Sequence, residues 1–425
     1  MVGNNNVNGV MICHEGDKAY YILLHDNYID NWNIVIELLE HENIYKVCYD
    51  IKLQIKILIE YNKYIKEPIG DPLIASWCLD PQDYEQNITL DKLLSKFNVT
   101  TVVTNNTTNK EELNKIGKET IETWLLMDKL YTMLLIEQLS SQFTTLEMPI
   151  TYLCAQMEYY GVGFSIEKCK EPLKTLQYKL QLIDSDIIKC VGHPIDVYSN
   201  SELCNILYDK LQLPRGRKLR NNNNNSNGIH STSAIIIPNN KKRKLLNNNN
   251  SNNNGNELYD TSAQYLSTIS HLHELPNLII EYRQLQQLID KYIVILPKYV
   301  KYNEKIKMCR IISTISQTCS STGRLSFINP NLQTIPHERI YKINNNTIKY
   351  EMRDSFKTTE DRLLIGVDYN SIELRVIAHF SQDNYLLNAL QFGDDVFQYL
   401  ATSWLNKQFI SRKERDQCKS ITYGY

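Results

Sequence analysis

The stretch LLIGVDYNSIELRVIAHF, residues 363–380, decides how the last third of the chain is interpreted. It opens with a continuous apolar run that ends in Asp368, a pattern typical of a buried β-strand with a carboxylate at its tip. Apolar residues then recur at helical spacing from Ile372 to Phe380. An acid between a strand and a helix is most often an N-cap, so this stretch alone assigns Asp368 no role beyond capping.

A second pattern lies further along the chain. Arg415, Lys419 and Tyr423 are spaced i, i+4 and i+8, which places two cations and an aromatic ring on one stripe of a helix. Cations neutralise phosphate oxygens and a ring packs on a base or sugar, so the stripe fits a nucleoside triphosphate. An amphipathic helix with solvated charges is the alternative interpretation of the same spacing.

Polar residues also gather upstream, in QTCSSTGRLS at 317–326 and NPNLQTIP at 329–336. Hydroxyl and amide side chains around one arginine, Arg324, are typical of a surface that contacts the backbone and minor groove of a nucleic acid. An ordinary polar loop is the alternative.

These motifs, taken in order, resemble the family A DNA polymerases. The likeness is carried by TGRLS at 322–326 with PNLQTIP at 330–336, by DYNSIELR at 368–375, and by the Arg415 stripe followed by Gly424. GDDVF at 393–397 and WCLDP at 77–81 are closer to the eukaryotic theta and nu branch than to the bacterial enzymes. The resemblance implies a DNA-template-directed DNA polymerase of repair synthesis, with primer-template DNA and deoxynucleoside triphosphates as its partners.

The resemblance also implies residue roles at the polymerase site. Asp368 would bind two catalytic Mg²⁺ ions, and the backbone carbonyl of Tyr369 would complete their coordination. Glu373 would be the steric gate that excludes a ribose 2′-hydroxyl. Arg415 and Lys419 would hold the triphosphate while Tyr423 packs on the incoming nucleotide.

On the DNA side, the resemblance places Arg324 in the minor groove at the primer terminus. Four further residues would lie near the duplex: Gln317, Thr318, Asn331 and Gln333.

Two departures from the family pattern limit these expectations. The family draws a second carboxylate from a later His-Asp-Glu hairpin, which does not occur in the sequence up to Tyr425, so we expect a truncated chain with an incomplete site. A non-catalytic DNA-binding fragment is therefore the rival hypothesis. The first domain resembles the 3′–5′ exonuclease fold without an Asp-x-Glu pair near its start. Asp50 and Asp128 fit two later metal ligands, with Trp124 where the family has Tyr. This predicts an inactive exonuclease domain, against the rival of an active one.

Periodicity divides the chain. Residues 1–145 alternate short β-rich segments with helical patterns, which predicts an α/β exonuclease-like domain. Residues 146–310 predict a helical thumb, interrupted at about 218–257 by Asn-rich tracts that cannot bury apolar area and are expected to be disordered. We expect an α+β polymerase domain overall, with the palm sheet in residues 311–405 and the start of the fingers helix in 406–425.

Composition excludes several classes of protein. No apolar run approaches the ~18 residues of a membrane span, so no membrane partner is expected. The ten cysteines form no C-x-x-C pair, which argues against zinc and disulfides and, with a polar segment after Met1, favours an intracellular protein. The net charge of −2 requires any polyanion-binding surface to be a local patch. KKRK at 241–244 favours nuclear import, with solvated charge as the alternative.

Overall fold

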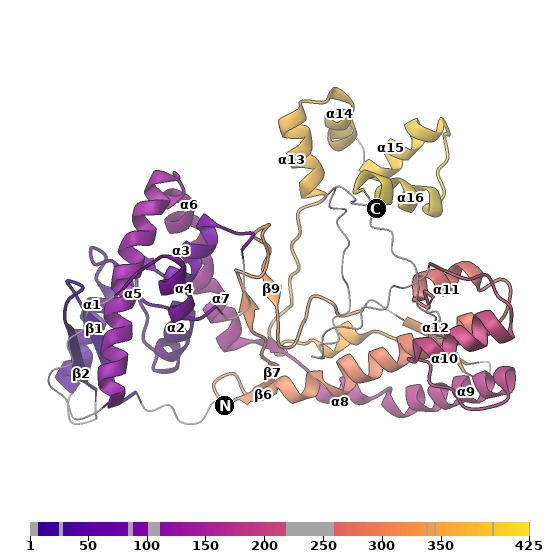
Figure 1. Cartoon of the computed structure of the whole chain (residues 1–425), viewed down its shortest axis with the longest axis horizontal. Helices are drawn as coiled ribbons and strands as arrows, with labels where there is room; N and C mark the ends of the chain where they lie inside the picture. Colours follow the sequence, from indigo (N-terminus) through magenta and orange to yellow (C-terminus); the bar gives the residue numbers. More distant parts are fainter. Residues whose placement is uncertain are drawn as a thin grey trace, which may run out of the picture. The chain divides into compact units, whose positions relative to one another are not determined.

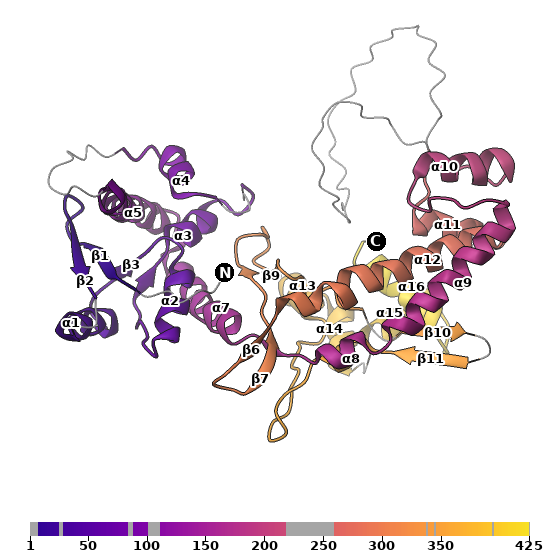
Figure 2. The ribbon, with the colours of Figure 1, turned by 90° about the horizontal axis from the view of Figure 1, so that it is seen from below.

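The computed structural model describes residues 7–24, 29–83, 88–100, 111–217, 259–336, 339–343, 346–392 and 395–424. The chain forms two compact units, Met1–Asp361 and Arg362–Tyr425, and each is described by itself. Figures 1 and 2 show the ribbon from two directions. The expectations for the Asn-rich tracts and for the basic tetrad at 241–244 fall outside the described residues.

The first part of the larger unit is an α/β region, as its alternating patterns predict. Two strands, β1 (Gly9–Cys13) and β2 (Ala19–Leu23), pair antiparallel with Met11 opposite Tyr21. Two very short strands, β3 (Lys46–Val47) and β4 (Ile69–Gly70), pair in parallel. The helices of this region are α1 (Ile29–Glu40), α2 (Ile51–Glu60), α3 (Pro72–Leu79), α4 (Leu90–Lys96), α5 (Glu111–Ile136), α6 (Ser140–Gln142), η1 (Phe143–Glu147) and α7 (Met148–Tyr160). One apolar core, with buried residues from Ile51 to Ala155, is shared by α2, α3, α4, α5, η1 and α7.

A buried carboxylate fixes the start of two of these helices. Asp71 accepts hydrogen bonds from the Leu73 N–H, which caps α3, and from the Ile51 N–H at the start of α2, both at 2.9 Å. Pro72 suits the first turn of α3 because it has no N–H to leave unpaired. Complete burial raises the pKa of Asp71 to about 7, although the backbone hydrogen bonds act in the opposite direction.

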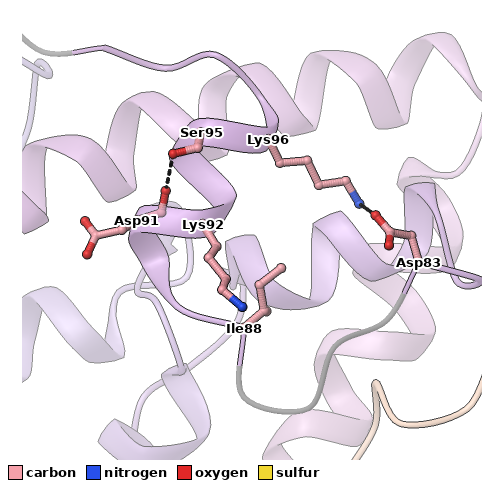
Figure 3. A pocket seen from close by; sticks show the side chains of 6 residues that line it. All are labelled: Asp83, Ile88, Asp91, Lys92, Ser95 and Lys96. Atoms are coloured by element: carbon pink, nitrogen blue, oxygen red, sulfur yellow. Dashed lines mark hydrogen bonds and ion pairs between the residues drawn. The ribbon is translucent and has the colours of Figure 1, made fainter. Parts of the chain in front are cut away.

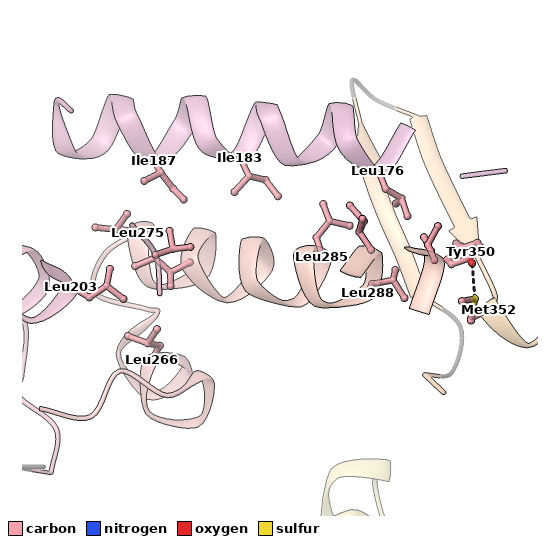
Figure 4. Close-up of a cluster of buried hydrophobic side chains, with 14 of the residues drawn as sticks. Leu176, Ile183, Ile187, Leu203, Leu266, Leu275, Leu285, Leu288, Tyr350 and Met352 are labelled. Carbon is pink, nitrogen blue, oxygen red and sulfur yellow. Dashed lines mark hydrogen bonds between the residues drawn. The ribbon is translucent and has the colours of Figure 1, made fainter. Parts of the chain in front are cut away.

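A helical region follows, within the residues 146–310 that the sequence predicts to be helical. Its helices are α8 (Ile166–Lys170), α9 (Leu173–Val191), α10 (Asn200–Cys204), η2 (Asn205–Lys210), α11 (Ala263–Ile269), α12 (Leu275–Leu288), η3 (Ile289–Val294) and η4 (Leu296–Tyr299). Figure 4 shows α9 and α12 side by side, with Leu176 facing the Leu285 and Leu288 end of α12 and Ile187 facing the Leu275 end. The two helices are therefore antiparallel, and each supplies one apolar stripe to a shared core.

The residues on either side of the Asn-rich insertion contact one another. The Asp260 N–H donates to the Arg217 carbonyl at 3.0 Å, and the Tyr265 hydroxyl donates to the Pro214 carbonyl at 2.6 Å. The Tyr259 N–H reaches the Cys204 sulfur at 3.2 Å. The helical region therefore bonds to itself across the ends of the insertion.

The rest of the larger unit contains several short strands. The order β5-β7-β6 forms one antiparallel sheet from Val162–Gly163, Met308–Ile311 and Val300–Asn303. Next come β8 (Ile315–Ser316) and β9 (Ser326–Phe327), which pair with Ile315 opposite Phe327. The hairpin of β10 (Arg339–Ile343) and β11 (Asn346–Tyr350) and the turn η5 (Met352–Ser355) complete the unit. Residues 312–314, between β7 and β8, have no regular secondary structure.

The described residues of the smaller unit form four helices around a small core. They are α13 (Ile372–Ser381), α14 (Asn384–Phe392), α15 (Val396–Leu405) and α16 (Arg412–Thr422), with Leu374, Phe397 and Leu400 among the buried residues.

The buried strand expected at residues 363–368 is wrong for this structure. The segment has no regular secondary structure, and Ile365 and Val367 are 85% and 92% exposed. A strand needs a neighbour to bond its backbone N–H and C=O groups, and the described residues of this unit include no strand. The helix expected from Ile372 to Phe380 is confirmed as α13.

Candidate functional site

The helix expected to carry the Arg415 stripe is confirmed as α16 for Arg415 and Lys419, while Tyr423 directly follows its last residue, Thr422. A capping motif determines where α16 begins. Ser411 caps it by accepting from the Glu414 N–H, and the Glu414 carboxylate accepts from the Ser411 N–H, the two halves of a capping box. Hydrogen bonds from Lys407 and Ser411 lower the pKa of Glu414 to about 2. The register of the stripe is therefore set by the first turn of α16.

The three residues of the stripe converge on one ring, Phe397 in α15. The Arg415 guanidinium lies 5.6 Å and the Lys419 ammonium 5.7 Å from the centre of the Phe397 ring. The Tyr423 ring is centred 5.7 Å from the same ring. Two cations and two rings are thus gathered where α15 and α16 pack, a combination that can bind a phosphate chain and a base or sugar.

Asp395, to which the sequence analysis gave no role, holds Arg415 in this cluster. The Arg415 Nε donates to Asp395 at 2.6 Å, and an Nη donates to Asp416 at 3.0 Å. Asp395 also caps α15 by accepting from the Phe397 and Gln398 N–H groups. Burial alone would raise the pKa of Asp395, but the hydrogen bond from Arg415 lowers it overall. An acid directly before an apolar helix, as in DDVF, was the signal that could have identified this cap.

The predicted metal ligands and steric gate lie at the start of the same unit. Asp368 and Tyr369 are exposed in the irregular segment, with Tyr369 at 79%. Glu373 is in the first turn of α13, which follows Ser371 in the left-handed conformation at φ 51°. Carboxylate and carbonyl oxygens are the ligands that Mg²⁺ prefers, so Asp368 and Tyr369 fit part of a magnesium site. Within the described residues, no group of three or more His, Cys, Asp or Glu side chains is placed to hold a metal ion.

The predicted DNA-contacting loop is bracketed by β8 and β9. Arg324 is exposed, one residue after Gly323, whose φ of +76° lets the loop turn. Thr318 is half-buried and Asn331 is exposed.

The two predicted glutamines already have protein hydrogen-bond partners: Gln317 bonds to α7 and η1, and Gln333 bonds to the backbone at the end of the loop. Gln317 is 6% exposed; it accepts from the Thr151 hydroxyl at 2.7 Å and donates to the Glu147 carbonyl at 3.0 Å. Gln333 donates to the Leu325 carbonyl at 2.8 Å and accepts from the Phe327 N–H at 3.2 Å. The structure thus places both side chains where they hold the loop, and contact of either with DNA stays a prediction.

The two residues predicted to fit exonuclease metal ligands lie on different elements of the α/β region. Asp50 precedes α2 in the left-handed conformation, and Asp128 is exposed on α5. Trp124 packs under Gly16, where an added Cβ would lie 2.6 Å from the indole ring.

A pocket of about 560 Å³ opens beside α4 in the same region (Figure 3). Its lining mixes charges of both signs, and Lys96 and Asp83 pair across it at 2.9 Å. It contains none of the predicted site residues.

Comparison with known proteins supports the resemblance of the second half of the chain to the family A DNA polymerases. Residues 240–425 match the family model described as DNA polymerase family A. DNA polymerase theta of Mus musculus is 24% identical over 440 residues, covering 89% of this chain and 17% of that protein. DNA polymerase I of Geobacillus stearothermophilus is 27% identical over 308 residues, covering 71% of this chain and 29% of that protein. This chain therefore spans less than a third of the length of either relative.

A solved structure supports the fold over a longer range. It is the POL domain of Pol1 from M. smegmatis in complex with DNA primer-template and dNTP, and it superimposes with a TM-score of 0.75 over 98% of this chain and 64% of that chain, at 19% identity. Among the described residues, no helix is both long and apolar enough to cross a bilayer. The family match over residues 240–425, the two polymerase relatives and this fold agree with the motifs from Gln317 onward, so this part of the chain resembles DNA polymerase family A.

Proposed function

We propose that this chain is the part of a DNA-template-directed DNA polymerase that binds the incoming deoxynucleoside triphosphate and the primer terminus and supplies one catalytic aspartate. The observation that carries the proposal is the convergence of Arg415, Lys419 and Tyr423 on Phe397 within the segment that matches the family. Two cations beside two aromatic rings suit a triphosphate attached to a base and sugar.

Binding of the triphosphate would exchange the partners of Arg415. The guanidinium has carboxylates of Asp395 and Asp416 as partners, and phosphate oxygens accept the same donors in the same forked geometry. Tyr423 remains 37% exposed, so its ring has a face on which a nucleotide can pack. Glu373 would exclude a ribose 2′-hydroxyl from the same site.

Asp368 and the Tyr369 carbonyl would hold Mg²⁺ together with the phosphates. Bound Mg²⁺ lowers the pKa of a primer hydroxyl and neutralises the leaving pyrophosphate. Asp368 is exposed in an irregular segment, so its carboxylate is accessible to both the ion and the substrate.

The loop between β8 and β9 would grip the primer terminus. Arg324 is exposed on it and carries the charge needed for a minor-groove contact. Thr318 on the same loop and Asn331 after β9 would add polar contacts to the duplex. We assign Gln317 and Gln333 to holding the loop, because both amides already bond to its backbone or to α7 and η1.

We further propose that the α/β region is exonuclease-like but has no hydrolytic activity. Asp50 and Asp128 fit two of the metal ligands of the family, but the Asp-x-Glu pair that would supply the other two is missing, and two-metal hydrolysis needs both pairs. Repair synthesis in the nucleus follows from the theta-like motifs and from the basic tetrad at 241–244. Incubation with a mismatched primer tests the first point, because shortening of the primer that requires Asp50 would contradict it.

Primer extension tests the main proposal. The protein is purified from its own cells with the natural sequence or with Asp368→Ala, and given primer-template, Mg²⁺ and deoxynucleotides. Nucleotide addition that Asp368→Ala abolishes supports the polymerase. Binding of primer-template without addition supports the rival DNA-binding module, and absence of binding overturns both.

A further inference from the structure

One buried carboxylate joins the α/β region to the DNA-contacting loop. Glu158, near the end of α7, is 3% exposed and has partners on two other elements. Its two oxygens accept from Lys52 at 2.7 Å and from Lys56 at 2.6 Å, both on α2. The Oε1 atom also accepts from the Ile315 N–H of β8 at 2.7 Å.

Lys52 links Glu158 to the backbone of β8. Its ammonium donates to the Ile315 carbonyl at 2.5 Å as well as to Glu158. Both backbone polar groups of Ile315 are therefore bonded to side chains from α2 and α7. Lys56, one helical turn away, pairs with Glu158 and, among the described residues, makes no hydrogen bond to β8.

Burial makes this contact sensitive to the loss of a partner. Burial alone would raise the pKa of Glu158, but Lys52, Lys56 and the Ile315 N–H outweigh it and keep the pKa below its ordinary value. The carboxylate thus remains ionised, and removing one cation would leave a buried charge incompletely paired.

The strand fixed in this way leads directly into the loop of Arg324. Only Gln317 to Leu325 separate β8 from β9, and Gln317 adds a second anchor to Thr151 of α7. The α2–α7 contact therefore sets where the loop begins, while the tip with Arg324 remains exposed.

We infer that Lys52 and Glu158 are positioning residues for the DNA-contacting loop, so that the α/β region raises affinity for primer-template without touching it. This rests on the proposed function of the loop. Lys52 acts through Ile315, whereas Lys56 serves only the charge balance of Glu158. The two lysines thus form a matched pair that differ in one bond.

The test compares Lys52→Met with Lys56→Met in the 425-residue chain. Each variant loses one positive charge from the same face of α2, so a general electrostatic effect on DNA binding is the same in both. Fluorescence anisotropy with a labelled primer-template, over a salt series, should show Lys52→Met binding about 5-fold more weakly than Lys56→Met at every salt concentration, about 1 kcal/mol. Equal affinities of the two variants would overturn the inference.

A double-mutant cycle separates positioning from general destabilisation. In an Arg324→Ala background the difference between the lysine variants should disappear, because the contact that the loop presents is already lost. A difference that persists unchanged would overturn the inference. Hydrogen exchange of residues 313–328 gives a second measure, and should be faster in Lys52→Met than in Lys56→Met.

Two further outcomes, no DNA binding by the natural sequence and misfolding of Lys52→Met, can be told apart from failure of the inference. If the natural sequence does not bind primer-template, the proposed function fails, and the exchange experiment still decides whether Lys52 fixes the loop. If Lys52→Met does not fold, Lys52→Gln takes its place, because the amide can keep one of the two hydrogen bonds, and the same comparisons with Lys56→Gln apply.

Discussion

Asp71 gives the sharpest prediction, because its burial determines the sign of a pH effect on stability. Its pKa in the folded chain is about 7, whereas an Asp in an unfolded chain has a pKa of about 3.9. Between these values the folded state binds a proton that the unfolded state has released. The contribution of Asp71 is therefore fully present below about pH 4 and is lost as pH rises through 7.

The magnitude follows from the same two values. From pH 6 to pH 8 the folded carboxyl passes from about nine-tenths protonated to about one-tenth, while the unfolded one stays ionised. The free energy of unfolding should therefore fall by about 1.4 kcal/mol over this interval from Asp71 alone.

Asp71→Asn is the matched perturbation. An Asn side-chain oxygen can still accept from the Leu73 N–H and cap α3, but its amide cannot accept from the Ile51 N–H. We expect a variant that is less stable at pH 6 by about 1 to 3 kcal/mol, since one buried N–H loses its acceptor. It should also lack the Asp71 part of the pH dependence.

Urea unfolding followed by tryptophan fluorescence measures both effects. Trp32, Trp77 and Trp124 lie in the α/β region, so a Trp404→Phe background restricts the signal to that region. The free energy of unfolding is compared at pH 6 and pH 8 with and without the Asp71→Asn substitution. A pH dependence that is equal in the two chains would refute the assignment of a raised pKa to Asp71.

Three further predictions address the binding sites and the insertion. Arg324→Ala should weaken primer-template binding by about 1 to 3 kcal/mol in anisotropy titrations, and unchanged affinity across a salt series would exclude it from the interface. Asp395→Asn keeps the cap of α15 but removes a carboxylate that competes with the ligand for Arg415. Calorimetry at low salt should therefore show that a deoxynucleoside triphosphate binds the variant about 3- to 10-fold more tightly. Weaker binding would mean that Asp395 mainly orients Arg415. Replacement of residues 221–256 by a short Gly-Ser linker should leave the melting temperature within about 2 °C, because the flanking residues already bond to one another, and a larger fall would show that the insertion contributes to the fold.

Local patterns in the sequence were sufficient to predict most helices of the fold. Helix α9, within the predicted helical residues 146–310, and helix α16, which carries Arg415 and Lys419, both form as expected, because an amphipathic stripe and a cap act within one or two turns. The strand predicted at residues 363–368 was wrong because a strand depends on contacts that are not local. An apolar run forms a strand only when another strand bonds to it, and a sequence pattern contains no information on whether that neighbour is present.

The hydrogen bonds that hold the candidate sites could not be predicted from the sequence, because they join residues that depend on tertiary packing to meet. Gln317 bonds to Glu147 across 170 residues, and Glu158 bonds to Ile315 across 157. Composition made Gln317 a candidate for DNA contact, but its burial was decided by the packing of α7 beneath the loop. Asp395 lies only 20 residues from Arg415, yet its pairing depends on how α15 and α16 pack.

These pairings affect how strongly the proposed triphosphate site of a nearly neutral chain can bind its ligand. Lysine and arginine number 46 against 48 acidic residues, so an attractive surface must be local. In the smaller unit, Arg415 is neutralised by Asp395 and Asp416, whereas its neighbour Lys419 contacts the Phe397 ring. A triphosphate that replaces those carboxylates exchanges one set of charge-assisted hydrogen bonds for another. The net gain of affinity from Arg415 is therefore smaller than its charge suggests, and Lys419→Met should cost at least as much triphosphate affinity as Arg415→Met at low salt. A larger loss from Arg415→Met, measured by the same calorimetry, would show that the carboxylates do not compete with the ligand.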